Sequence, residues 1–262
     1  MDSPFLAFQR RLVSGGQVQE ASSGVWRLEI PAGSSQRYRL AQLDDYSALP
    51  RSKFRWQPPV ELSLRARASH AEIPGTWGFG FWNDPFSFSL GIGGASRRLP
   101  ALPNTAWFFF ASAPNYLSLR DDLPAQGFLA ATFRSPDLPG ALLGVLSPLA
   151  VFAAIHPVGR LARKIARRFI AQSAALISTS LEAWHEYKVA WMTSQVRFFI
   201  DDSLVLQTSI SPLGPLGLVL WIDNQYAALP PDGRLRSGVL SNPAPAWIEL
   251  ADLKVNRLPT NL

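Results

Sequence analysis

Residues 184–206 read WHEYKVAWMTSQVRFFIDDSLVL, and their pattern is that of paired β-strands. Apolar and polar side chains alternate along 186–192 and again along 195–200, which is the period of a strand with one buried face. The polar sequence Asp201-Asp202-Ser203 separates the second run from Leu204-Val205-Leu206, as the turn of a hairpin does. This part of the chain therefore predicts antiparallel β-structure.

Comparable short runs recur along most of the chain and are separated by turn residues, among them 22 prolines and 18 glycines. The composition, 47% hydrophobic and 17% charged over 262 residues, suits one globular domain that spans residues 1–262. About a dozen strands with turns between them are typical of a two-sheet sandwich or jelly roll, so the expected fold class is all-β. The further predicted strands are 25–30, 60–67, 77–82, 105–111, 128–133, 217–223 and 246–255.

Several segments, in the same order, resemble strands of glycoside hydrolase family 16. Residues 184–191 and 195–202 are similar to that family's paired strands, W/F-H-x-Y-x-I-x-W and x-I-x-F-Y-V-D-G. Upstream, residues 74–82 (PGTWGFGFW) resemble the family's G-x-W-P-A-F-W strand, and downstream 217–224 and 247–255 look like its closing strands. The resemblance implies a concanavalin A-like jelly roll, in which two antiparallel sheets present a concave ligand face.

The chain departs from this family at the catalytic strand, which in the family carries E-x-D-x-x-E or a close variant. Retaining hydrolysis needs two carboxyl groups about 5 Å apart across the scissile bond. The best candidate strand between Trp82 and Trp184 is residues 104–112 (NTAWFFFAS), which contain no acid. We therefore reject the family's retaining mechanism for this chain and expect a protein without that enzymatic activity.

The same resemblance indicates which residues line the ligand face. Four tryptophans belong to strands that line it in the family, although only alternate residues of a strand point to one face. Side chains that follow such strands are candidates for the few polar groups that orient a ligand in an apolar pocket. The alternative interpretation is that each of these tryptophans is instead buried in the core. The candidate ligand-binding residues are Trp77, Trp82, Asn83, Trp107, Phe109, Trp221, Asp223 and Asn224.

One segment, 138–178, breaks the β pattern and is predicted to be an insertion in the jelly roll. It begins with an apolar run, 138–155, and continues from Pro157 to Ala175 with apolar residues at helical spacing. No Asp or Glu occurs between Asp137 and Glu182, and the net charge of +6 is concentrated here. The apolar helix positions are Val158, Leu161, Ile165 and Phe169, and the basic positions are Arg160, Arg163, Lys164, Arg167 and Arg168.

Two interpretations of this helix remain open. Its five basic residues are candidates for contact with an anionic membrane surface, with the apolar face in the interface. Alternatively, the apolar face packs on the sandwich and the basic residues are solvated. The run 138–155 is not expected to span a membrane, because proline and glycine interrupt it and a span needs about 20 continuous residues. No signal peptide is visible, so a cytoplasmic or peripheral membrane location is expected.

Other classes of site have little support. The sequence contains no cysteine, and its three histidines, at 70, 156 and 185, lack metal-ligand spacing, so neither a metal nor a cofactor is expected. Residues 91–96 (GIGGAS) lack the lysine of a phosphate-binding loop and indicate a turn. Nucleic-acid binding is not expected either, because the basic residues are confined to one segment without a recognisable module.

Two functions from different classes therefore remain. The first is a lectin-like module that binds carbohydrate in the groove without hydrolysing it. The second is a membrane-surface protein that binds or transforms a lipidic or polycyclic small molecule, which the phenylalanine-rich strand 105–111 favours because it would make the groove apolar. The expected partners are a carbohydrate or a hydrophobic small molecule, and an anionic membrane surface.

Overall fold

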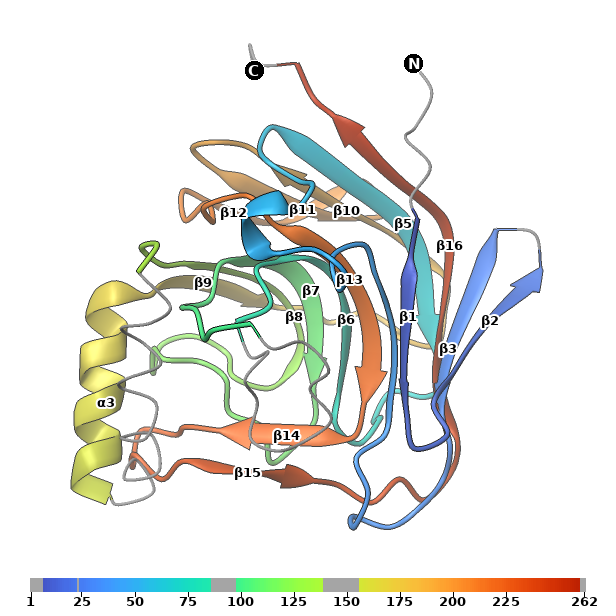
Figure 1. Ribbon diagram of the computed structural model, residues 1–262, viewed down its shortest axis with the longest axis horizontal. Coiled ribbons are helices and arrows are strands. Elements are labelled where there is room, and N and C mark those ends of the chain that lie inside the picture. Colours follow the sequence, from blue (N-terminus) through green and yellow to red (C-terminus); the bar gives the residue numbers. More distant parts are fainter. Residues whose placement is uncertain (1–6, 23, 86–97, 139–155, 260–262) are drawn as a thin grey trace.

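The computed structural model describes residues 7–22, 24–85, 98–138 and 156–259, and its architecture is two stacked antiparallel sheets (Figure 1). Each large sheet has seven strands. Sheet A runs in the order β1 (Gln9–Val13), β4 (Leu40–Asp44), β13 (Gly217–Asp223), β6 (Thr76–Trp82), β7 (Thr105–Ala111), β8 (Gly127–Arg134) and β9 (Ala171–Leu176). Sheet B runs in the order β12 (Ser203–Thr208), β11 (Val196–Ile200), β10 (His185–Trp191), β5 (Val60–Ala68), β16 (Ala246–Arg257), β3 (Val25–Ile30) and β2 (Gln17–Ser22).

Smaller elements complete the described chain. The strands β14 (Gln225–Ala228) and β15 (Arg236–Val239) form a separate pair, and η1 (Arg51–Lys53) is a 3-10 turn. The helix α3 (His156–Phe169) stands beyond β9, on the side of sheet A that faces away from sheet B (Figure 1). The predicted all-β jelly roll is confirmed, and so is the hairpin of β11 and β12.

The helical segment needs a correction at its C-terminal end. The predicted helix extended to Ala175, but α3 ends at Phe169 and residues 171–176 form β9. This strand pairs with β8 along its whole length, from Arg134 opposite Ala171 to Leu129 opposite Leu176. Its sequence, AQSAAL, has no strong preference for a strand, so the free edge of β8 decides its conformation. Part of 138–178 is therefore sheet, not insertion.

Two predicted features fall outside the described residues. They are the apolar run 138–155, of which the structure describes only Leu138, and the turn at 91–96. The strands that the sequence pattern did not reveal are β1, β2, β4, β9, β14 and β15. Most of them lie at sheet edges or outside the two sheets, where side chains need not alternate between core and solvent.

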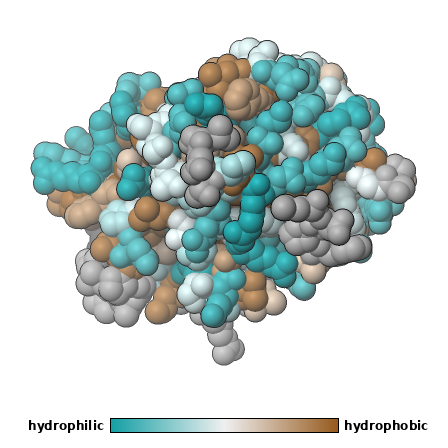
Figure 2. All heavy atoms as spheres, turned by 90° about the horizontal axis from the view of Figure 1, so that it is seen from above, coloured by the Kyte–Doolittle hydropathy of each residue, from teal (hydrophilic) through white to brown (hydrophobic). Residues whose placement is uncertain are grey.

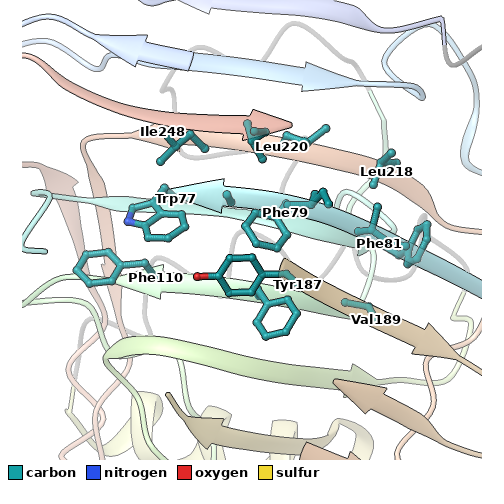
Figure 3. Close-up of a cluster of buried hydrophobic side chains, with 14 of the residues drawn as sticks. Trp77, Phe79, Phe81, Phe110, Tyr187, Val189, Leu218, Leu220 and Ile248 are labelled. Carbon is teal, nitrogen blue, oxygen red and sulfur yellow. The ribbon is translucent and has the colours of Figure 1, made fainter. Parts of the chain in front are cut away.

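The core lies between the two sheets and is built by alternate residues of facing strands. On β6, Trp77, Phe79 and Phe81 point toward sheet B (Figure 3). On β10, Tyr187 and Val189 point back, and the rings of Phe79 and Tyr187 lie 5.2 Å apart. Interlocking aromatic rings therefore hold the sheets face to face.

We expect Phe108→Ala to be among the most destabilising substitutions in this core. Phe108 is fully buried, and its ring lies 5.1 Å from Tyr187 and 5.3 Å from Phe198 of the opposite sheet. Truncation should lower the free energy of unfolding by about 3 to 5 kcal/mol, measured by urea denaturation. Leu204→Ala is the control, because Leu204 is 52% exposed and its loss should cost less than about 0.5 kcal/mol. Equal losses in the two variants would contradict this description of the core.

Candidate functional site

Strand alternation places a second set of aromatic side chains on the outer face of sheet A, away from sheet B. Trp82 comes from β6, Trp107 and Phe109 from β7, and Trp221 from β13. These three strands are neighbours, so their outward side chains meet. We call these four residues the outer-face aromatic cluster.

Two glycines of β6 make room for this cluster. Gly78 lies opposite both Trp221 and Phe109, and Gly80 lies opposite Trp107. A Cβ atom on Gly78 would lie 2.8 Å from Cη2 of Trp221, and one on Gly80 would lie 2.6 Å from Cβ of Trp107. A Cβ at either position would also collide with the backbone of β7, 2.4 Å from the carbonyl oxygen of Phe108 at Gly78 and 2.5 Å from that of Ala106 at Gly80. Glycine at both positions therefore has a steric reason.

Each of the four rings contacts at least two of the others. The centroid of the Trp107 ring lies 5.2 Å from that of Phe109, 5.4 Å from Trp221 and 5.8 Å from Trp82. Trp82 and Trp221 are nearly parallel, at an interplanar angle of 5° and a centroid distance of 6.2 Å. The sheet thus carries a continuous aromatic surface across three strands.

Most of this aromatic surface is covered. Trp107, Phe109 and Trp221 are only 7%, 5% and 8% exposed, whereas Trp82 is partly exposed. The cluster packs with other apolar residues of the same face, namely Leu40, Tyr46, Phe54, Ala111, Leu129, Ala131 and Val219. It therefore behaves as a second core, and Trp82 is the member most open to solvent.

A buried polar network borders the cluster at Trp221. The indole Nε1 of Trp221 donates to Oγ1 of Thr76 (3.0 Å), and Thr76 Oγ1 donates to Oδ1 of Asp223 (2.8 Å). The Tyr38 hydroxyl donates to the other carboxylate oxygen (3.2 Å). Burial raises the pKa of Asp223 to about 6, although these donors oppose the rise. Asp223 thus orients Trp221 through Thr76.

A second polar group was missed by sequence analysis. Gln42 of β4 lies opposite Trp221, and its Nε2 donates to Oδ2 of Asp44 (2.8 Å). Asp44 also accepts from the backbone N–H groups of Tyr46 (3.1 Å) and Ser47 (2.7 Å). The polar residues at alternate positions of Leu40–Asp44 were the available signal, since alternation places both on one face.

Charged side chains lie at the Trp82 end of the cluster. Arg98 pairs with Asp84 at 2.5 Å, and its guanidinium lies 5.4 Å from the centroid of the Tyr46 ring. Arg51 donates to the backbone carbonyl of Asn83 (2.7 Å). The Tyr46 and Trp82 rings are 6.1 Å apart, so this charged group adjoins the exposed edge of the cluster. No sequence motif marked these arginines.

The structure separates the predicted ligand-binding residues into two groups. Trp82, Trp107, Phe109, Trp221 and Asp223 lie together on the outer face of sheet A. The other three, Trp77, Asn83 and Asn224, occupy different positions.

Trp77 requires a correction. It points into the interior, stacked 5.0 Å from Phe128, because its position on β6 has the opposite parity to Trp82. The two asparagines hold loops in place. The side chain of Asn83 donates to the carbonyl of Leu102 (2.8 Å), and that of Asn224 donates to the carbonyl of Leu240 (2.8 Å).

The chemistry that this face offers is limited. The strand β7, which occupies the centre of the cluster, carries no carboxylate on either side. Within the ranges that the structure describes, no three histidine, aspartate or glutamate side chains are grouped to hold a metal ion. The arrangement offers aromatic surface and buried polar groups that could orient a ligand.

Comparison with known proteins supports the fold alone. No protein-family model matches the chain, and no curated protein matches it. The legume lectin-like domain from Entamoeba histolytica is similar with a TM-score of 0.52 and 6% identity, over 96% of this chain and 90% of that one.

Two further solved structures are similar at lower scores. LamAcat from Zobellia galactanivorans has a TM-score of 0.47 and 14% identity, over 90% of this chain and 78% of that one. The Emp47p carbohydrate recognition domain has a TM-score of 0.47 and 12% identity, over 97% and 90% of the two chains. The similarity to the Entamoeba histolytica domain supports the two-sheet jelly-roll fold of this chain.

The raised pKa of Asp223 predicts a pH-dependent stability. Because its folded-state pKa of about 6 exceeds the ordinary value of 3.8, the folded protein binds this proton more tightly than the unfolded chain. The resulting stabilisation is present below about pH 4 and is lost as the pH rises through about 6. An asparagine side chain carries no ionisable carboxyl group, so the variant Asp223→Asn does not lose stability in this way as the pH rises. The stability of the variant relative to wild type should therefore rise by about 2 to 3 kcal/mol between about pH 4 and pH 7.

Urea denaturation at a series of pH values measures this difference. Asp45, whose pKa is also raised by burial to about 6, is present in both proteins and cancels in the comparison. A stability difference that stays constant across the pH range would show that Asp223 does not titrate as described.

Proposed function

We propose that the protein is a non-hydrolytic carbohydrate-binding jelly roll whose ligand contacts the outer-face aromatic cluster at Trp82. The observation that carries this proposal is the partly exposed Trp82 ring in contact with two buried indoles, Trp107 at 5.8 Å and Trp221 at 6.2 Å. Aromatic rings accept the apolar faces of sugar rings, and a platform that is already ordered loses little entropy on binding.

A buried donor within the cluster supports a polar ligand. In the part of the chain that the structure describes, the buried Nε1 of Trp107 has no hydrogen-bond partner. An unpaired buried donor costs about 1 to 3 kcal/mol, which an accepting hydroxyl group would recover. Among the same described residues, the buried Nε1 atom of Trp82, on the same face, also lacks a hydrogen-bond partner, and so does that of Trp77, which lies between the sheets.

The fold favours the same class of ligand. The Entamoeba histolytica domain with the TM-score of 0.52 is described as legume lectin-like, which makes a carbohydrate our first choice of ligand class. This part of the proposal is an analogy, because one fold hosts many functions. The non-hydrolytic part rests on β7, which lacks the carboxylates that retaining hydrolysis requires.

A hydrophobic small molecule is the second candidate. The cluster packs with buried apolar residues, including Leu129, Ala131 and Val219, so an apolar ligand at Trp82 would extend an apolar layer and bury more apolar surface. The two candidates differ in what they require of Trp107, because a sugar offers hydroxyl oxygens that accept from its Nε1 atom and a purely apolar ligand offers no acceptor.

Glycan binding should depend on Trp82 and on the Trp107 donor. On a glycan array followed by calorimetry, Trp82→Ala should weaken binding by about 1 to 3 kcal/mol, and binding to wild type should quench tryptophan fluorescence. Trp107→Phe keeps an aromatic ring but removes Nε1, so it should also weaken binding.

The control for both variants is Trp247→Ala. Trp247 lies on sheet B, partly exposed beneath the Arg27 guanidinium at 4.2 Å, and its removal should leave glycan affinity unchanged. If no glycan binds while a hydrophobic dye binds wild type and not Trp82→Ala, the second candidate replaces the first. Equal weakening in Trp247→Ala would place the ligand elsewhere.

The purified protein should release no reducing ends from β-1,3 or β-1,4 glucan, galactan or xyloglucan. The physical reason is the absence of an acid and nucleophile pair on β7. A reducing-sugar assay over a pH series tests this expectation. Turnover that disappears when one pair of carboxylates is replaced by amides would contradict it.

A further inference from the structure

The helix α3 is attached to the protein through its polar side. Arg163 is 4% exposed, and its Nη1 donates to the backbone carbonyls of Ser118 and Leu229, both at 2.6 Å. Its Nη2 pairs with Asp121 at 2.5 Å. Arg167 Nη1 also donates to Asp121 (3.3 Å), but Arg167 is exposed. Arg163 is the buried basic residue of α3 and makes three polar contacts to the body, so it anchors the helix.

The remaining inward contacts of α3 involve small residues. Gly159 is buried, and Ala162 and Ala166 are partly buried on the same side. The turn between β14 and β15 approaches closely, because a Cβ on Gly233 would lie 2.4 Å from the backbone nitrogen of Arg160. The side of α3 that faces the body thus offers little room for large side chains.

The large apolar side chains of α3 consequently face outward. Val158, Leu161, Ile165 and Phe169 are 38%, 57%, 47% and 51% exposed. Their spacing of three and four residues places them in one stripe along the helix. Figure 2, in which α3 lies at the left edge, shows hydrophobic spheres beside hydrophilic ones there. An amphipathic helix normally buries this stripe, so the orientation of α3 is reversed.

Basic side chains occupy the neighbouring side of α3. By helical spacing Lys164 and Arg168 lie nearest the stripe, and Arg160 and Arg167 lie farther round the helix. Arg160, Lys164, Arg167 and Arg168 are exposed. Together with Arg163, Asp121 and Pro231 they line an open pocket of about 470 Å³. Asp121 is the only acid of that lining, so the pocket carries a large excess of positive charge. An apolar stripe beside a cationic pocket is complementary, in hydrophobicity and in charge, to a surface on which hydrocarbon lies next to phosphate groups.

We propose that α3 binds the protein to an anionic lipid bilayer. The stripe of Val158, Leu161, Ile165 and Phe169 lies at the boundary of headgroups and acyl chains, and the neighbouring cations contact lipid phosphates. Long basic side chains reach from such a depth to the headgroups. Among the described residues no helix is long and apolar enough to cross a membrane, so this contact is interfacial.

The charge of α3 also distinguishes the bilayer from a second copy of the chain. Pairing two α3 stripes would bring two sets of exposed cations close together, and like charges repel. An anionic bilayer, in contrast, neutralises them. The inference is independent of ligand binding at the outer-face aromatic cluster, because α3 contributes no residue to that cluster.

Co-sedimentation of the full chain with vesicles tests the proposal. The protein should bind vesicles of phosphatidylcholine mixed with phosphatidylglycerol, should not bind phosphatidylcholine alone, and should be released by high salt, because screening weakens the attraction. The double variant Lys164→Gln/Arg168→Gln should lower the partition coefficient about thirtyfold, since each cation contributes about 1 kcal/mol near an anionic surface. Leu161→Ser/Phe169→Ser should lower it at least about tenfold.

Matched controls change the same residue types on another surface. Arg197→Gln and Leu204→Ser replace exposed side chains of β11 and β12 and should leave partitioning unchanged. Arg163 is kept in all variants because it anchors the helix. Circular dichroism and urea denaturation of each variant establish that the fold is intact.

Four results would overturn the proposal. The first is equal binding to neutral and anionic vesicles, and the second is no binding to either. The third is dimerisation in light scattering that Leu161→Ser/Phe169→Ser abolishes, with no vesicle binding by the wild type, because the stripe would then pair with a second copy. Loss of binding in the Arg197→Gln control would equally contradict a site on α3.

Discussion

The contact between Tyr187 and three rings of the opposite sheet holds the sandwich together. Tyr187 of β10 lies 5.2 Å from Phe79, 5.1 Å from Phe108 and 5.7 Å from Phe128, so one side chain of sheet B packs against three adjacent strands of sheet A. This contact decides which residues of sheet A face outward. Because successive side chains of a strand point to opposite faces, Trp82 and Trp107 must point outward once Phe79 and Phe108 point inward. The position of the outer-face aromatic cluster is thus a consequence of how the core is packed.

Sheet A is apolar on both faces, and this distinguishes it from a sheet with one solvated side. Phe108 and Phe109, successive residues of β7, are both buried, one in each apolar cluster. Gly78 and Gly80 allow the second layer, because their lack of side chains leaves space for Trp107 and Trp221. A ligand at Trp82 would therefore extend an ordered aromatic layer, and the raised pKa of Asp223 reflects the same desolvation.

In α3 the contacts of one buried arginine accompany an orientation that the hydrophobic pattern does not predict. A helix with an apolar stripe would ordinarily bury that stripe, which contributes about 25 cal/mol for each Å² removed from water. Here Arg163 finds Asp121 and two backbone carbonyls in a buried position, while the narrow approach at Gly233 admits only small residues. The apolar stripe of α3 and its remaining cations consequently lie exposed.

The sequence alone determined the strands whose side chains alternate, the hairpin at residues 201–203, the amphipathic character of α3 and the absence of acids from β7, because each is a local pattern. Tertiary structure decided what local pattern leaves open. It turned Trp77 inward and Trp82 outward, made residues 171–176 a strand by pairing them with β8, and set Arg163 of α3 against the body. In each case the deciding contact joins residues that are distant in sequence. The periodicity of a segment shows that it has two different faces, but not which of them such a contact will bury.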